Sequence, residues 1–97
     1  MIIRIVKMTF DPQKTDDFLK IFDESKQLIR EMKGCSHLEL LSDINSPNIY
    51  FTYSYWNSES DLNEYRNSPL FADVWTKTKA LFSAKAEAWS LQQDILL

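Results

Sequence analysis

Apolar and polar positions alternate with a period of two in four stretches of the chain, which predicts four β-strands. These stretches are residues 2–10, 35–43, 49–56 and 84–92. The turn formers Asn45-Ser46-Pro47-Asn48 join the second and third strands as a hairpin. In the last strand, one face carries only the small side chains of Ala84, Ala86, Ala88 and Ser90.

The strand predicted at 49–56 is the most informative, because it is aromatic on both faces. Successive side chains point to opposite sides of a strand, which separates Tyr50 and Trp56 from Phe51, Tyr53 and Tyr55. An antiparallel strand usually keeps one face wet and polar. We therefore predict apolar cover on both faces, from helices on one and from a second subunit on the other.

Three stretches between the strands have the three- and four-residue apolar spacing of helices. The first begins at Asp11-Pro12, an N-cap followed by proline, and is predicted to run to about Lys33 before Gly34 stops it. Its apolar stripe comprises Phe18, Ile21, Phe22, Ser25, Leu28, Ile29 and Met32. A short helix follows the cap Ser58, and a third, opened by Ser68-Pro69, carries apolar residues as far as Phe82.

The element order β-α-β-β-α(α)-β predicts an α+β, ferredoxin-like fold with a split β-α-β-β-α-β arrangement and an antiparallel sheet. At 97 residues, we expect residues 1–97 to form one domain. Two such sheets packed back to back would form a dimeric α/β barrel, and the apolar residues on both strand faces agree with that.

Composition excludes several classes of function. A net charge of −3 with no basic stripe gives no reason to expect nucleic acid, and no apolar run approaches the ~20 residues of a membrane span. The first residues lack the layout of a signal peptide, so a cytoplasmic location is expected. One cysteine permits no internal disulfide, and no Asp, Glu or His set has metal-ligand spacing.

Several motifs resemble the antibiotic biosynthesis monooxygenase family. They are the start Ile-Ile-Arg-Ile-Val-Lys-Met-Thr-Phe, Gly34-Cys35, Tyr-Phe-Thr-Tyr-Ser-Tyr-Trp, Ser68-Pro69-Leu70-Phe71 and Glu87-Ala88-Trp89-Ser90. The resemblance covers essentially the whole chain. It implies a homodimer with one pocket per subunit between the sheet and its helices. The family is functionally mixed, so the resemblance says little about the substrate.

The resemblance also bears on cofactors. In the haem-degrading branch a His, an Asn and a Trp build the site, and the matching positions here are Trp75, Val6 and Tyr65. A haem role is therefore not expected. In the cofactor-independent branch, an aromatic residue on the short helix and a polar residue one turn earlier contact the substrate. Tyr65 and Asp61 stand at those positions, and we expect no cofactor and no metal.

Two residues are candidates for catalysis. His37 is the only side chain whose unperturbed pKa lies near neutrality, so it could remove a phenolic proton; the alternative, which we favour, is a structural histidine at the sheet edge with a hydrogen-bonded ring. Tyr65 could donate its hydroxyl to a substrate oxygen, or be an ordinary buried tyrosine.

Other candidates would bind substrate. Phe71 and Trp75 lie one turn apart on an apolar stripe, as core residues or as a pocket wall. Arg4 is a charge among apolar neighbours and must be paired or reach water. It could hold an anionic substrate oxygen, but we favour a pair with a carboxylate such as Glu39 or Glu87. Cys35 is expected to be a small buried residue.

The family resemblance, together with these residues, implies a cofactor-independent monooxygenase acting on a small aromatic quinol or phenol between sheet and helices. His37 and Tyr65 would be catalytic, and Arg4, Asp61, Phe71 and Trp75 would bind the substrate. Two alternatives stay open: a non-catalytic small-molecule-binding or structural dimer, and a signal-processing isomerase of the same fold.

Overall fold

Four strands form one antiparallel sheet in the computed structural model, which describes residues 1–97. They are β1 (Ile2–Thr9), β2 (Cys35–Ser42), β3 (Ile49–Trp56) and β4 (Glu87–Gln92). The order across the sheet is β2-β3-β1-β4, which is the predicted ferredoxin-like arrangement. The α+β fold is therefore confirmed, and within one chain the sheet is open rather than closed into a barrel.

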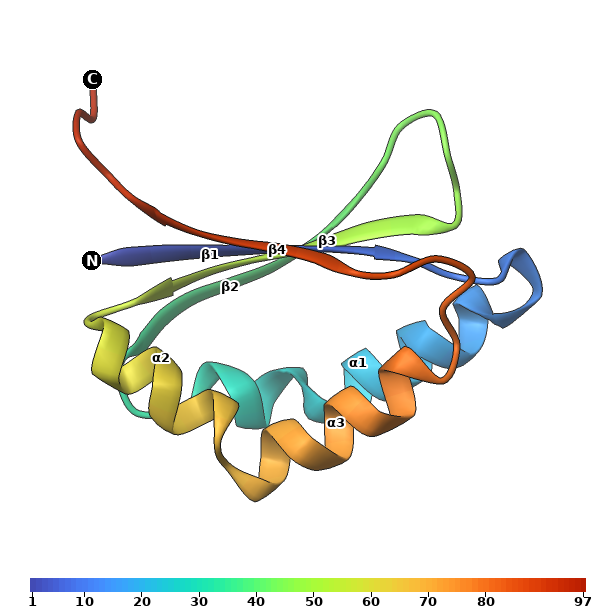
Figure 1. Cartoon of the computed structure of the whole chain (residues 1–97), viewed down its shortest axis with the longest axis horizontal. Helices are drawn as coiled ribbons and strands as arrows, with labels where there is room; N and C mark the ends of the chain where they lie inside the picture. Colours follow the sequence, from blue (N-terminus) through green and yellow to red (C-terminus); the bar gives the residue numbers. More distant parts are fainter.

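All three helices lie on one side of the sheet (Figure 1). They are α1 (Thr15–Arg30), preceded by the 3-10 turn η1 (Pro12–Lys14), α2 (Glu59–Arg66) and α3 (Pro69–Lys79). Each predicted cap is present: Asp11, Ser58 and Ser68 accept hydrogen bonds from the amides of Gln13, Asp61 and Phe71, respectively. Gly34 has the left-handed φ of 84° expected of a helix stop.

Two helices end earlier than the sequence predicted. α1 ends at Arg30 rather than Lys33, and α3 ends at Lys79 rather than Phe82. The chain leaves α3 early because Phe82 forms a bridge to Phe10, which returns the backbone to the sheet before β4 begins. Leu28, predicted to lie on the inner stripe of α1, is 55% exposed because it lies at the flank of that stripe.

A β-bulge in β2 puts Cys35 and His37 on opposite faces of the sheet, although strict alternation along this strand predicts that they share one. The pairing shifts by one residue between Cys35 and His37, so Cys35 lies opposite Trp56 while His37 lies opposite Tyr55. The extra residue reverses the alternation that the sequence suggested. Cys35 therefore packs under the helices, against Trp56 and Leu62, whereas His37 points to the other face of the sheet.

The core under the helices consists of two separate clusters. One contains Met8, Phe10 and Phe18, and the other contains Cys35, Trp56 and Leu62. Met8 pairs with Tyr50 near one end of β3, and Trp56 is the last residue at the other end. The clusters thus lie at opposite ends of the sheet, and the middle of this layer is less completely filled.

No helix covers the other face of the sheet (Figure 1). The strand register places Ile5, Tyr53, Tyr55 and Trp89 there, as predicted from the aromatic strand. Leu41, Trp89 and Leu91 are among its exposed large side chains, and the apolar tail Ile95-Leu96-Leu97 is also exposed. None of the helices is long and apolar enough to span a membrane.

Candidate functional site

A cavity of about 350 Å³ lies between the sheet and the helices, in the region between the two core clusters. Of the 19 residues that line it, 14 are hydrophobic. Its floor comes from all four strands, with the small side chain of Ala88 in β4, and its roof comes from α1, α2 and α3. The volume is at the lower end of the range for small-molecule pockets, and a mostly apolar lining is typical of them.

A row of aromatic rings follows one side of the cavity. The rings of Trp56 and Tyr65 are stacked at 5.0 Å, and Tyr65 meets Phe71 edge-on at 5.2 Å. Phe71 stacks with Trp75 at 5.8 Å, and Trp75 meets Phe82 at 5.6 Å. All except Phe82 line the cavity. The structure thus places three of the predicted site residues, Tyr65, Phe71 and Trp75, in one continuous wall.

Tyr65 is a neutral hydroxyl donor in this wall. Burial, with a smaller contribution from the neighbouring Cys35, raises the pKa of Tyr65 to about 12. The phenol therefore keeps its proton at neutral pH. It can donate a hydrogen bond or a proton to an oxygen atom bound in the cavity. It cannot act as a base, because almost none of it is ionised to the phenolate at neutral pH.

Arg4 brings a positive charge into the same cavity. In the sheet it lies between Ser54 and Ser90, and its Nη1 donates a hydrogen bond of 2.9 Å to Ser90 Oγ. Burial, and then the nearby charge of Arg66, lower the pKa of Arg4. Arg66, at the end of α2, also lines the cavity from an exposed position. Two arginine side chains therefore line one mainly apolar cavity.

The favoured pairing of Arg4 with a carboxylate is wrong. Glu87 is 3.7 Å from Lys7, and Glu39 is 2.8 Å from His37. Both carboxylates belong to strand positions on the uncovered face, whereas Arg4 points under the helices. The second possibility, that Arg4 is free to hold an anionic ligand oxygen, agrees with the geometry.

His37 does not lie in the cavity. Its Nε2 is 2.8 Å from Glu39 Oε2, and its ring packs 4.7 Å from Tyr55 on the uncovered face of the sheet. β2 is the edge strand, so His37 lies at the sheet edge with a hydrogen-bonded ring, in the position that the structural alternative describes. The sheet separates His37 from Tyr65, and the structure does not bring the two predicted catalytic residues together.

Asp61 also lies outside the cavity lining. Its side chain packs over Gly34, where any added Cβ would overlap the Asp61 carboxylate. A glycine at position 34 is thus needed for its backbone angle and for this close approach. Asp61 thus packs α2 against the turn that follows α1, and its side chain does not line the cavity.

Two polar cavity residues were missed as functional candidates. Arg66 follows Tyr65 directly and reaches the cavity from the end of α2. Thr78 lies on the inner stripe of α3 and is only 3% exposed, and its hydroxyl has no hydrogen-bond partner in the chain. The signal for Thr78 was a hydroxyl on an otherwise apolar helix stripe.

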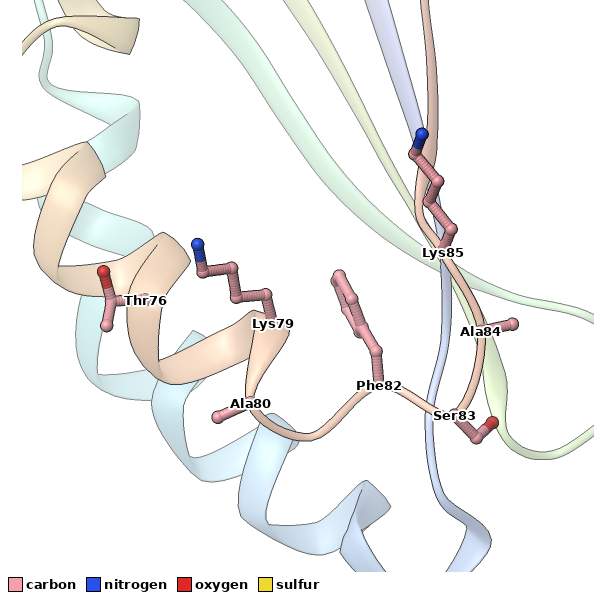
Figure 2. Close-up of a pocket in the computed structure, with 7 residues that line it drawn as sticks. All are labelled: Thr76, Lys79, Ala80, Phe82, Ser83, Ala84 and Lys85. Atoms are coloured by element: carbon pink, nitrogen blue, oxygen red, sulfur yellow. The ribbon is translucent and has the colours of Figure 1, made fainter.

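A second, shallow hollow lies between the end of α3 and the segment leading to β4 (Figure 2). Figure 2 shows Lys79 and Lys85 on either side of Phe82. The hollow is open to solvent, and exposed lysines and small side chains form most of its lining. The enclosed cavity is the better candidate for binding a small molecule.

The donors of the cavity do not form a metal site. Its titratable residues are Arg4, Tyr65 and Arg66, and arginine and neutral tyrosine are poor metal ligands. Nowhere in the chain do three or more His, Cys, Asp or Glu side chains form a group that could hold a metal ion. What the cavity offers is an apolar, aromatic space with cationic and neutral hydrogen-bond donors.

An antiparallel sheet with helices on one face and a cavity between the two layers defines a small α+β domain of the ferredoxin-like class. The chain belongs to the antibiotic biosynthesis monooxygenase family, whose model matches residues 1–77. This confirms the resemblance seen in the sequence. None of the curated proteins searched matches the chain significantly.

Solved structures agree on the fold. An antibiotic biosynthesis monooxygenase superposes with a TM-score of 0.92 at 16% identity, over 98% of this chain and 100% of the other. A conserved protein from Methanosarcina mazei Go1 gives 0.90 at 18% identity, over 97% and 94% of the two chains. Rv0793 from Mycobacterium tuberculosis gives 0.90 at 16% identity, over 98% and 96%. At such low identities the likeness shows the fold alone.

Proposed function

We propose that this protein is a monooxygenase that oxidises a small aromatic phenol or quinol in the cavity, without a metal or an organic cofactor. The observation that carries the proposal is Arg4, a partly buried charge with no acidic partner that faces a mostly apolar, aromatic cavity. Such a charge is costly unless a ligand or water compensates it. A phenolate supplies a flat ring for the aromatic wall and an anionic oxygen for the guanidinium.

The arginines replace a general base in this proposal. A positive charge within a few ångströms favours the ionised form of a phenol and lowers its pKa. Arg4 and Arg66 both face the cavity, so a bound phenol would lose its proton to solvent at the exposed end marked by Arg66. The distance of His37 from the cavity then has no consequence for the reaction.

The substrate itself supplies the electrons. A phenolate can transfer one electron to dioxygen, and the resulting radical and superoxide combine to form a C–O bond. The O–O bond of this peroxide then breaks, one oxygen atom stays on the ring, and the other leaves as water with the two hydrogens lost by the substrate. For a quinol the balance is quinol plus dioxygen to hydroxyquinone plus water, so no external reductant is needed.

Tyr65 would act on the peroxide. Because its pKa of about 12 keeps it protonated, it can donate to the distal oxygen while the O–O bond breaks. Phe71 and Trp75 would hold the ring by stacking, and the apolar lining would exclude water from the reacting atoms.

The test is oxygen uptake by the purified, metal-free protein with a panel of small hydroquinones and naphthols. Wild type should exceed the spontaneous rate, and Arg4→Gln and Tyr65→Phe should each lower it by about 10-fold or more. His37→Ala is the matched control and should leave uptake unchanged. Uptake equal to buffer, or uptake that survives both cavity substitutions, would refute the proposal.

One observation favours a second candidate, a non-catalytic binding protein. No residue that lines the cavity is a base at neutral pH. If the cavity only binds, the same phenols will bind with an affinity that depends on Arg4 while oxygen uptake stays at the buffer rate.

We also propose that the protein is a homodimer. Support comes from the uncovered face of the sheet, where Tyr53, Tyr55 and Trp89 lie without a helix above them. A second copy laid on this face would bury those rings and close the two open sheets into a barrel.

A further inference from the structure

The hydroxyl of Thr78 is a buried polar group without a partner. Thr78 is 3% exposed and lines the cavity, and its Oγ1 makes no hydrogen bond within the chain. A helical threonine commonly satisfies its hydroxyl on a carbonyl of the preceding turn, but Thr78 does not. Leaving such a group unpaired costs stability, and native proteins rarely keep one without a reason.

Thr78 and Tyr65 mark different ends of the cavity. Tyr65 touches Phe71 in the first turn of α3. Thr78 lies about two turns, roughly 10 Å, further along the same helix, past Trp75. The aromatic wall runs between them. The cavity lining therefore has Tyr65 and Arg66 toward one end, apolar rings in the middle and Thr78, with its unpaired hydroxyl, toward the other end.

We propose that the substrate is an elongated two-ring phenol that carries a second oxygen, as a hydroxyl or carbonyl, at the end opposite the reacting phenolate. Thr78 Oγ1 exchanges a hydrogen bond with that second oxygen, because a hydroxyl can both donate and accept. The orientation rests on the proposed function, which places the phenolate at Arg4. The volume of about 350 Å³ agrees with a compact two-ring molecule.

This arrangement would make Thr78 a specificity-determining residue. A ligand without the distal oxygen leaves the buried hydroxyl unpaired, and sites of that kind discriminate strongly against the analogue that lacks the polar group. A ligand with the distal oxygen relieves the cost that the free protein carries.

The test is equilibrium binding without oxygen, measured by calorimetry with 2-naphthol and naphthalene-2,6-diol. These molecules share a phenol and differ only in the distal hydroxyl. Wild type should bind the diol about 10-fold more tightly, the effect of one hydrogen bond. Thr78→Val keeps the shape and removes the hydroxyl, so it should bind both equally. Thr78→Ser should retain the preference.

Thr76→Val is the matched control, because Thr76 lies on the exposed side of α3 and its substitution should leave the preference unchanged. Thermal unfolding of each variant verifies folding, and Thr78→Val should be at least as stable as wild type. The inference is overturned if wild type binds both ligands equally, if it binds neither, or if Thr78→Val keeps the preference. Selective binding without oxygen uptake would refute the oxygenase proposal and leave the ligand assignment standing.

Discussion

Arg4, Tyr65 and Thr78 are three polar residues that line a mostly apolar cavity. Arg4 has a serine as its hydrogen-bond partner but no carboxylate, Tyr65 is kept neutral by burial, and Thr78 has no partner in the chain. The partly buried charge of Arg4 and the unpaired hydroxyl of Thr78 each cost free energy in the protein alone. A single phenolic ligand with oxygen atoms at both ends would satisfy all three.

The buried phenol of Tyr65 predicts a loss of stability at alkaline pH. Its folded-state pKa of about 12 lies above the ordinary value of 10.0. Between these values the unfolded chain ionises first, so stability falls as pH rises from about 10 to 12, by about 2–3 kcal/mol. Below pH 10 this residue contributes no pH dependence.

Urea unfolding of wild type and Tyr65→Phe across that pH range would measure the effect. The phenylalanine variant has no proton to lose, so wild type should lose stability relative to it by that amount, while the remaining titrating groups cancel in the comparison. A stability difference that stays constant from pH 9 to pH 12 would contradict the burial of Tyr65.

At the scale of elements, caps and turns were the most predictable features. Asp11, Ser58 and Ser68 cap helices as expected, and Gly34 ends the first helical segment in the left-handed region. These signals are local, because a side chain bonds an amide two or three residues away. The strands and their order followed from alternation and from the rules of connection.

The site was only partly predictable, for a physical reason. One extra residue in β2 puts Cys35 under the helices, and no sequence periodicity reveals which residue a bulge absorbs. The placement of Arg4 away from Glu39 and Glu87 depends on long-range register. The position of Phe71, Trp75 and Tyr65 on the inner side of the helices was predictable, because helix periodicity and the family resemblance both point to that face.

The contact between α2 and Gly34 gives a prediction at this scale. Gly34→Ala adds a Cβ at a φ of 84° and against the Asp61 side chain, so it should cost at least about 2 kcal/mol in unfolding free energy. In an Asp61→Gly background the steric part disappears, and the cost should fall toward the backbone term alone. An equal cost in both backgrounds, measured by urea unfolding, would show that the contact carries no strain.

The whole molecule has two unlike faces. Helices cover one side of the sheet (Figure 1). The cavity lies under them, while the other side presents aromatic and aliphatic side chains. An antiparallel sheet can keep one wet face, but such a face is normally polar. A second copy is the cover that the composition of this face favours.

The proposed dimer predicts that a charged side chain introduced on the uncovered sheet face breaks the dimer, while one introduced on the helical layer does not. Leu91→Glu, on the uncovered sheet face and 47% exposed, should shift the protein from dimer to monomer in sedimentation velocity. Leu28→Glu, on the helical layer and 55% exposed, is the matched control and should leave the sedimentation coefficient unchanged. Dissociation by both substitutions, or by neither, would count against the sheet face as the interface.

The central claim is that the cavity carries out monooxygenation with electrons from the substrate alone. The direct measurement uses isotopically heavy dioxygen with metal-free protein and the most active phenol of the panel, followed by mass spectrometry of the product. The account predicts one heavy oxygen atom per product molecule, an amount of labelled product that falls by about 10-fold or more with Arg4→Gln, and an unchanged amount with His37→Ala. Product oxygen that comes from water, or labelling indifferent to Arg4, would contradict it.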